Sequence, residues 1–185
     1  MSTIKKEFKY LVSLSLLFTI ISCTHKVKDF TEIQKMLDTV SIKMKEGSSD
    51  TLYLNKTIIE IKQYAAKHQS DTLAAKLLFE AAQQLEAHHL SEKAVVLLDE
   101  IQTKFSNTLY AAKALVTEGF IYNNILHNYD LAKVKYEEYL TKYRNLDSNL
   151  SRDVELELHN MGKSAEDLIK EFETKLKEKE KQEKN

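Results

Sequence analysis

The sequence predicts an all-α fold, on three observations of composition and pattern. The chain of 185 residues has no proline and only three glycines, whereas sheet folds need such turn residues at short intervals. Alanine, leucine, glutamate, lysine and glutamine, all good helix formers, are abundant. Apolar residues make up 43% of the chain and recur with a helical period. A chain of this length and apolar content is enough to form one domain, or a short helical array, with a hydrophobic core.

The N-terminal residues have a pattern of their own. A basic start at residues 4–9 is followed by an apolar run at residues 10–21, and the only cysteine, Cys23, comes just after it. The run of about a dozen residues is shorter than the roughly 20 that a membrane-spanning helix needs. This layout is typical of a secretory signal. The alternative is an ordinary signal or a membrane anchor in which Cys23 is incidental.

Residues 20–23, Ile-Ile-Ser-Cys, resemble the lipobox of bacterial lipoproteins, with an aliphatic residue, then a small residue, before the invariant cysteine. The resemblance implies that residues 1–22 are a signal peptide and that Cys23 carries acyl chains such as palmitate. Two or three chains anchor a protein stably, because each buried methylene contributes about 0.8 kcal/mol. Residues 23–28 would be a linker. Thr24 and the basic residues after it favour the outer membrane and its periplasmic face.

Two stretches of the remaining chain recur after about 37 residues. Residues 67–78 are similar to residues 104–115, and residues 91–105 are similar to residues 129–143. Within each unit the apolar residues lie at i, i+3, i+4 and i+7, which predicts two amphipathic helices joined by a short turn. Small residues in both helices would let each pair pack closely, and these are Ala82, Ala94, Gly119 and Ala132.

The recurring pattern resembles the tetratricopeptide repeat (TPR), a helix-turn-helix unit of about 34 residues, although the proline of that repeat is missing. The residues that match its signature are Leu78, Ala82, Ala94 and Leu98 in one unit and Leu115, Gly119, Tyr122, Ala132 and Tyr136 in the next. The resemblance implies a short right-handed superhelical solenoid of antiparallel helix pairs. Its units would span residues 29–69, 71–106 and 108–144 of a domain at 29–147.

The stretch at residues 104–122 is similar to the repeats of two bacterial envelope proteins, the outer-membrane assembly lipoprotein BamD and the coordinator CpoB. Residues 148–176 are predicted to cap the array, because a solenoid must cover its last apolar face. Gly162 and the capping pattern at residues 164–167 predict a break within them. The apolar stripe expected to form the cover is Leu168, Ile169, Phe172 and Leu176. Residues 177–185 read as a charged, solvent-exposed tail.

Eight residues are candidates for binding a partner segment, because the first helix of each TPR unit builds the concave groove of that family. Carried onto this chain, the groove positions are Lys76, Phe79, Gln83, Glu86, Lys113, Val116, Phe120 and Asn123. Phe79 and Phe120 would be apolar anchors among polar neighbours. The alternative is that both phenylalanines pack against neighbouring helices.

No motif typical of catalysis or of a bound cofactor occurs in the sequence, so the prediction is a protein that is not an enzyme. His88, His89 and His127 fall near the predicted turns of adjacent units, where they would either approach one another around a metal or serve as polar turn residues. The whole chain has a net charge of −1, and residues 1–22 contribute +2 of it. Residues 23–185 therefore carry a net charge of −3. An acidic remainder does not favour nucleic acid as a partner.

The sequence therefore favours a membrane-tethered, non-catalytic scaffold that binds another protein of the bacterial envelope. The covalent lipid on Cys23 is the only non-protein group expected, and no small-molecule substrate is predicted. One alternative is a subunit of an outer-membrane assembly or envelope-maintenance complex, similar to BamD. An alternative of another class is a metal-binding protein or enzyme that uses the three histidines.

Overall fold

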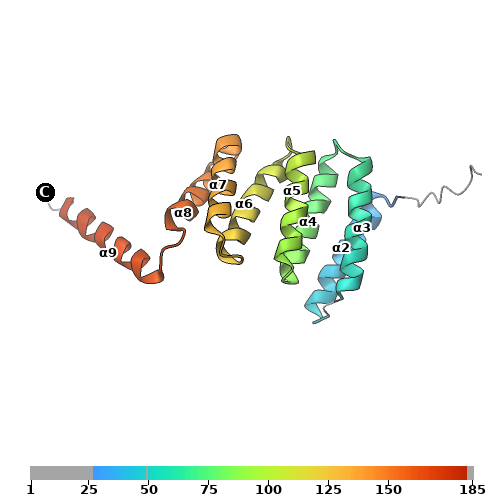
Figure 1. The fold of residues 1–185 in the computed structure, drawn as a ribbon, viewed down its shortest axis with the longest axis horizontal. Coiled ribbons are helices and arrows are strands. Elements are labelled where there is room, and N and C mark those ends of the chain that lie inside the picture. The colour runs from blue at the N-terminus through green and yellow to red at the C-terminus, as the bar shows by residue number, and fades with distance from the viewer. Residues whose placement is uncertain (1–26, 49, 183–185) are drawn as a thin grey trace, which may run out of the picture.

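The computed structural model describes residues 27–48 and 50–182, and in this part of the chain it contains eight α-helices and no strand (Figure 1). The prediction of an all-α fold is confirmed. Cys23 and the signal-like segment lie outside the described residues. The helices are α2 (Phe30–Lys45), α3 (Thr51–Lys67), α4 (Thr72–Ala87), α5 (Ser91–Lys104), α6 (Leu109–Asn124), α7 (Tyr129–Tyr143), α8 (Ser148–Asn160) and α9 (Ala165–Gln182). None of these helices is both long and apolar enough to span a membrane.

Short polar side chains set where most of the helices begin. Their oxygens accept hydrogen bonds from backbone N–H groups of the first turn, and a cap of this kind contributes about 1 kcal/mol. The capping residues of this type are Asp29, Asp50, Asp71, Asn128 and Asp147. Residues with positive φ follow the ends of several helices and turn the chain back. These residues are Gly47, His89, His127 and Gly162.

The helices from α2 to α8 lie in a row, and each packs against the next along the chain (Figure 1). The helix α4 also packs against both α2 and α6. Because α4 touches neighbours on several sides, about half of its residues are buried. A large apolar core extends from α2 to α6, and a smaller one lies between α6, α7 and α8.

The helices α6 and α7 approach each other closely at Gly119. A Cβ atom added at Gly119 would lie 2.3 Å from Cε1 of Tyr136, whose side chain is fully buried. Glycine is therefore required here because the tyrosine ring of α7 occupies the space of a side chain on α6. Both residues belong to the predicted repeat signature, and Gly119 was expected to let the helix pair pack closely; its contact with Tyr136 was not predicted.

Of the two C-terminal helices predicted to cap the array, α8 packs against the row of helices and α9 does not. Val154 of α8 is buried in the smaller core, with Leu158 and Met161 packed beside it. Most of the apolar stripe of α9 is uncovered: Leu168 is half-buried near the end of α8, but Ile169 and Phe172 are 60% and 64% exposed. The expectation that this stripe caps the array is wrong, and α9 points away from the row (Figure 1).

The physical reason lies in the side of α8 that faces away from α6. On α6, Ala112, Leu115 and Gly119 form the apolar side against which α7 packs. The residues at the corresponding places on α8 are Arg152, Glu155 and His159. These three are exposed and polar, so α9 finds no apolar surface on α8 to cover.

Candidate interaction surfaces and a buried ion cluster

The eight residues predicted to form a groove lie on the neighbouring helices α4 and α6, and we call them the α4–α6 surface. The α4 residues are Lys76, Phe79, Gln83 and Glu86, and the α6 residues are Lys113, Val116, Phe120 and Asn123. Because α4 packs against α6, the two sets belong to adjacent helices. Their side chains differ in exposure, which decides which of them are free to contact a partner.

Phe79 does not provide an exposed anchor. Its side chain is 9% exposed, and its ring lies 5.8 Å from the ring of Tyr110 on α6 in a tilted arrangement. The ammonium group of Lys113 lies 5.6 Å from the centre of the same tyrosine ring. Phe79 thus packs against the neighbouring helix, which was the alternative interpretation, and its use as an anchor is corrected.

Phe120 is the apolar side chain that remains available on the α4–α6 surface. It is 50% exposed, and Val116, one turn earlier on α6, is half-buried. Gln83 and Lys113 are exposed, whereas Lys76 is held by a hydrogen bond to Gln34 of α2. The surface thus presents one large apolar group among polar ones, an arrangement that suits recognition of a polypeptide segment.

The α4–α6 surface continues onto α8. Asn123 donates a hydrogen bond to Glu157 of α8 at 3.3 Å. Both residues line a hollow of about 530 Å³ where the ends of α6 and α8 meet the start of α9. Amide, ammonium and hydroxyl groups from Asn160, Lys163 and Ser164 also line this hollow. Its polar lining offers hydrogen-bond partners for a peptide backbone.

A buried ion cluster joins α5, α6 and α7. Glu118 of α6 is fully buried, and its Oε2 lies 2.7 Å from Nζ of Lys135 on α7. Gln102 of α5 donates to the same oxygen at 2.5 Å. Lys135 also donates to Asp99 of α5 at 2.8 Å. Four polar side chains from three helices thus meet between elements whose remaining contacts are apolar.

Burial raises the pKa of Glu118 to about 7, although the ion pair with Lys135 acts in the opposite direction. Its Oε1 is buried and meets no hydrogen-bond partner in the described part of the chain. Burial also acts to lower the pKa of Lys135, but the hydrogen bonds to Asp99 and Glu118 outweigh it, so that pKa is raised. The cluster therefore holds one permanent cation and one carboxyl group that titrates near neutral pH.

Sequence reasoning missed this cluster, although a signal for it was present. The buried side of α6 runs through Ala111, Ala114 and Ile121, and Glu118 falls on the same side at helical spacing. A carboxylate on the apolar side of a helix needs a partner. Nothing in the spacing names that partner, because Lys135 lies on another helix.

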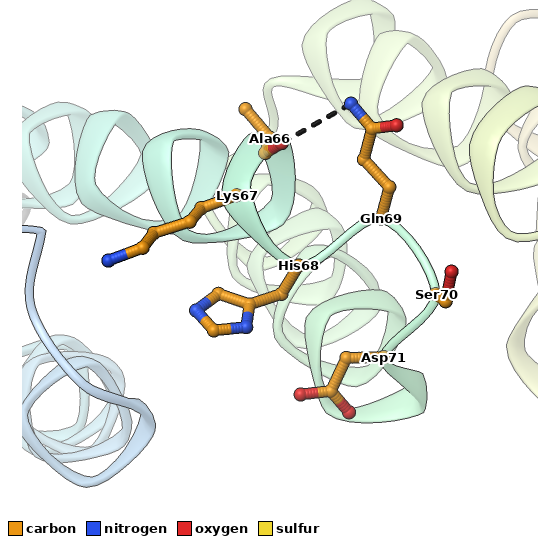
Figure 2. A pocket seen from close by; sticks show the side chains of 6 residues that line it. All are labelled: Ala66, Lys67, His68, Gln69, Ser70 and Asp71. Atoms are coloured by element: carbon orange, nitrogen blue, oxygen red, sulfur yellow. Dashed lines mark hydrogen bonds between the residues drawn. The ribbon is translucent and has the colours of Figure 1, made fainter.

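The turn between α3 and α4 forms a polar hollow, lined by the six residues from Ala66 to Asp71 (Figure 2). Figure 2 shows that their side chains point in different directions, and that Gln69 donates to the backbone oxygen of Ala66. The ring of His68 stacks on Tyr64 at 4.2 Å, and the Tyr64 hydroxyl donates to Asp71. These groups bind one another rather than converge on a common point.

The histidines considered as metal ligands lie in turns. His88 and His89 follow α4, and His127 follows α6. His89 and His127 have φ values of 57° and 50°, which place them in the left-handed region. Across residues 27–48 and 50–182, no three side chains of histidine, cysteine, aspartate or glutamate are grouped so as to hold a metal ion.

An apolar groove between α3 and α5 was not predicted; we call it the α3–α5 groove. Leu85 and Leu97 are buried and form its floor, Ile58 is half-buried, and Val96 is 59% exposed. Asn55 and two lysines, Lys62 and Lys93, complete its lining. The repeat pattern could not reveal the groove, because the space between two helices depends on how far apart they pack.

Comparison of the chain with protein-family models, with curated proteins and with solved structures found no match.

Proposed function

We propose that this protein is a membrane-tethered, non-catalytic scaffold whose α4–α6 surface binds a segment of another envelope protein. In this proposal the helices form a short TPR-like solenoid, and Cys23 carries the lipid that anchors it to the periplasmic face of the outer membrane. The recurrence of about 37 residues and the packing of α4 against both α2 and α6 support the repeat arrangement.

The exposure of Phe120 is the observation that carries the proposal. Most of α6 is buried or half-buried between its neighbours, yet this phenylalanine is 50% exposed beside the half-buried Val116. Fully burying a phenylalanine contributes about 1.5–3 kcal/mol, so covering the exposed half contributes roughly 1 kcal/mol. That is about a five- to tenfold gain in affinity. A tether then raises the effective concentration of scaffold and partner at the membrane.

The test is photo-crosslinking in the intact envelope, with p-benzoylphenylalanine in place of Phe120 in the full chain. The expected result is one specific partner protein whose yield falls five- to tenfold when Gln83 and Lys113 are both changed to glutamate. The matched control places the same photo-crosslinker at Phe172, a second strongly exposed phenylalanine among the described residues, where this partner is not expected. Absence of any partner at residue 120, or the same partner at both positions, would overturn the proposal.

The lipid anchor is tested separately with Cys23→Ser in the full chain. Wild-type protein is expected in the membrane fraction after washing with high salt and carbonate, and in the detergent phase of a phase separation. The variant is expected to lose the lipid and, if its signal is still cleaved, to leave the membrane. Equal membrane retention of the two forms would contradict the proposed role of Cys23.

A further inference from the structure

Two apolar features of the described structure have no partner within it, and they lie at distant places. One is the stripe on α9 formed by Ile169, Phe172 and Leu176, which are 60%, 64% and 45% exposed. The other is the α3–α5 groove, with Val96 on its wall and Leu97 in its floor. Exposed apolar surface of this kind typically marks a site of association.

The electric charges around these two features are opposite. The first half of α9, residues 165–173, contains four acidic residues and one lysine. The groove is lined by Lys93 and by Lys62, which pairs with Glu100 at 3.3 Å, and its other lining is apolar except for Asn55. The acidic first half of α9 therefore complements the groove in charge, and its apolar stripe complements the groove in polarity.

The space of the groove also suits the stripe. The groove encloses about 180 Å³, and an apolar cavity of about 150 Å³ is known to accept benzene. The phenyl ring of Phe172 is therefore of a size to enter beside Val96. The neighbours of Phe172 on the stripe, Ile169 and Leu176, would lie along the groove at helical spacing.

The α9 of the same molecule does not reach this groove. Leu176, the last residue of the stripe, lies roughly 17 Å from the start of α9 at 1.5 Å per residue. The helices α6 and α7 stand between α8 and α5 (Figure 1), and each packed helix adds about 8–10 Å. Glu171 also fixes the first turns of α9 to the end of α8, through Lys163 at 2.6 Å and His159 at 2.7 Å. The occupant must therefore come from another molecule.

We infer that the stripe of α9 in one copy of this chain binds in the α3–α5 groove of a second copy. The interface joins different surfaces of the two molecules, so the association is head-to-tail, and a pair of copies keeps one free groove on the first copy and one free stripe on the second. A lipid surface is a poorer occupant for α9, because its polar side carries both signs of charge instead of being rich in lysine and arginine. This inference does not depend on the function proposed for the α4–α6 surface.

The test uses two differently tagged copies of the full chain, expressed together, with p-benzoylphenylalanine in place of Phe172 in the first copy. After irradiation, the adduct is isolated through both tags and mapped by mass spectrometry. The expected attachment lies within residues 50–104 of the second copy. Attachment to α9 of the second copy, to lipid or to another protein would overturn the inference, as would the absence of an adduct.

Matched valines separate the groove from a general effect of substitution. Val96→Glu in the second copy is expected to lower the adduct yield at least tenfold, because it places a carboxylate in the groove opposite the acidic helix. Val134→Glu on α7 makes the same change at a similar exposure, 54% against 59%, and is expected to leave the yield within twofold. An equal loss for the two variants would contradict the assignment.

Reciprocal variants test the head-to-tail geometry without the photo-crosslinker. Copies with Phe172→Ser are expected not to associate with one another, and the same holds for copies with Val96→Glu. A mixture of the two variants is expected to form pairs, because one supplies an intact stripe and the other an intact groove. Failure of the mixture to pair would overturn the geometry. Phe120→Ser serves as the control for the α4–α6 surface and should leave self-association unchanged.

Discussion

The helix pairs α6–α7 and α8–α9 have the same order of elements along the chain, but their second helices pack differently. Each pair consists of a helix, a short turn and an amphipathic second helix. In the first pair, α7 packs closely on α6, with Tyr136 lying over Gly119. In the second pair, α9 leaves the row and keeps Phe172 exposed. The difference lies in the receiving helix, not in the helix that arrives.

The receiving side of α6 contains Leu115 and Gly119, which are apolar and small. The receiving side of α8 contains Glu155 and His159, which interact instead with Arg144 and Glu171. An amphipathic helix docks only where it exchanges water for apolar contacts. The comparison teaches that a stripe such as that of α9 predicts an association but not the identity of its partner surface.

The largest expected effect on stability comes from truncating the aromatic side chain of α7, compared with the same change on α9. Tyr136→Ala is expected to lower the free energy of unfolding by about 3–5 kcal/mol, because it empties a fully buried site. Phe172→Ala is expected to change it by less than about 0.5 kcal/mol, because an exposed side chain loses few contacts. Urea unfolding followed by circular dichroism measures both. A similar loss for the two variants would contradict the packing described for α9.

The ion cluster predicts how the α6–α7 pair responds to pH. The pKa of Glu118 is raised to about 7 from an ordinary value of 4.5, so the folded state binds the proton more tightly than the unfolded state does. The stability that the protonated Glu118 carboxyl contributes to the folded state is fully present below about pH 4.5 and is lost as the pH rises through 7. One pKa unit corresponds to 1.36 kcal/mol, so the loss is up to about 3 kcal/mol.

Glu118→Gln removes this titration and tests the effect. The variant is expected to gain in stability relative to the wild type as pH rises from 5 to 8, in urea unfolding at one-unit steps. Glu157→Gln on α8, a carboxylate that is only half-buried, is the control and should show little change with pH over this range. A pH-independent difference between wild type and Glu118→Gln would contradict a raised pKa.

A smaller effect is expected from adding one methyl group at the contact between α6 and α7. Gly119→Ala places a Cβ atom within 2.3–2.8 Å of the Tyr136 ring, and overpacking of this kind costs about 1–3 kcal/mol. The higher helix propensity of alanine offsets about 1 kcal/mol of that cost. In a double-mutant cycle, Tyr136→Leu should relieve the clash, so the combined loss should be smaller than the sum of the two single losses.

The smallest effect is expected at the junction of α8 and α9. Hydrogen bonds from Lys163 and Lys175, and one with His159, hold the pKa of the half-buried Glu171 carboxyl well below its usual range. Glu171→Gln should weaken these contacts and speed amide hydrogen exchange at residues 165–172, with no change in α6 or α7. Equal exchange rates in wild type and variant would show that these contacts do not hold α9.

Periodicity and composition alone determined that the chain is all-helical, and they located small residues such as Gly119 where two helices pack closely. These features were predictable because helix propensity and the 3.6-residue period act within a few residues of sequence. The break before α9 was predictable for the same reason. Ser164 and Asp167 cap each other's backbone there over a distance of three residues.

Only the tertiary structure decided which apolar side chains are covered. Phe79 on α4 and Phe120 on α6 were both predicted as groove residues, yet Phe79 meets Tyr110 while Phe120 remains 50% exposed. The tertiary structure likewise decided that the stripe of α9 is exposed, that a groove lies between α3 and α5, and that Lys135 is the partner of Glu118. Each depends on what a different helix brings to a point in space, and such contacts join residues far apart in sequence whose meeting no local pattern encodes.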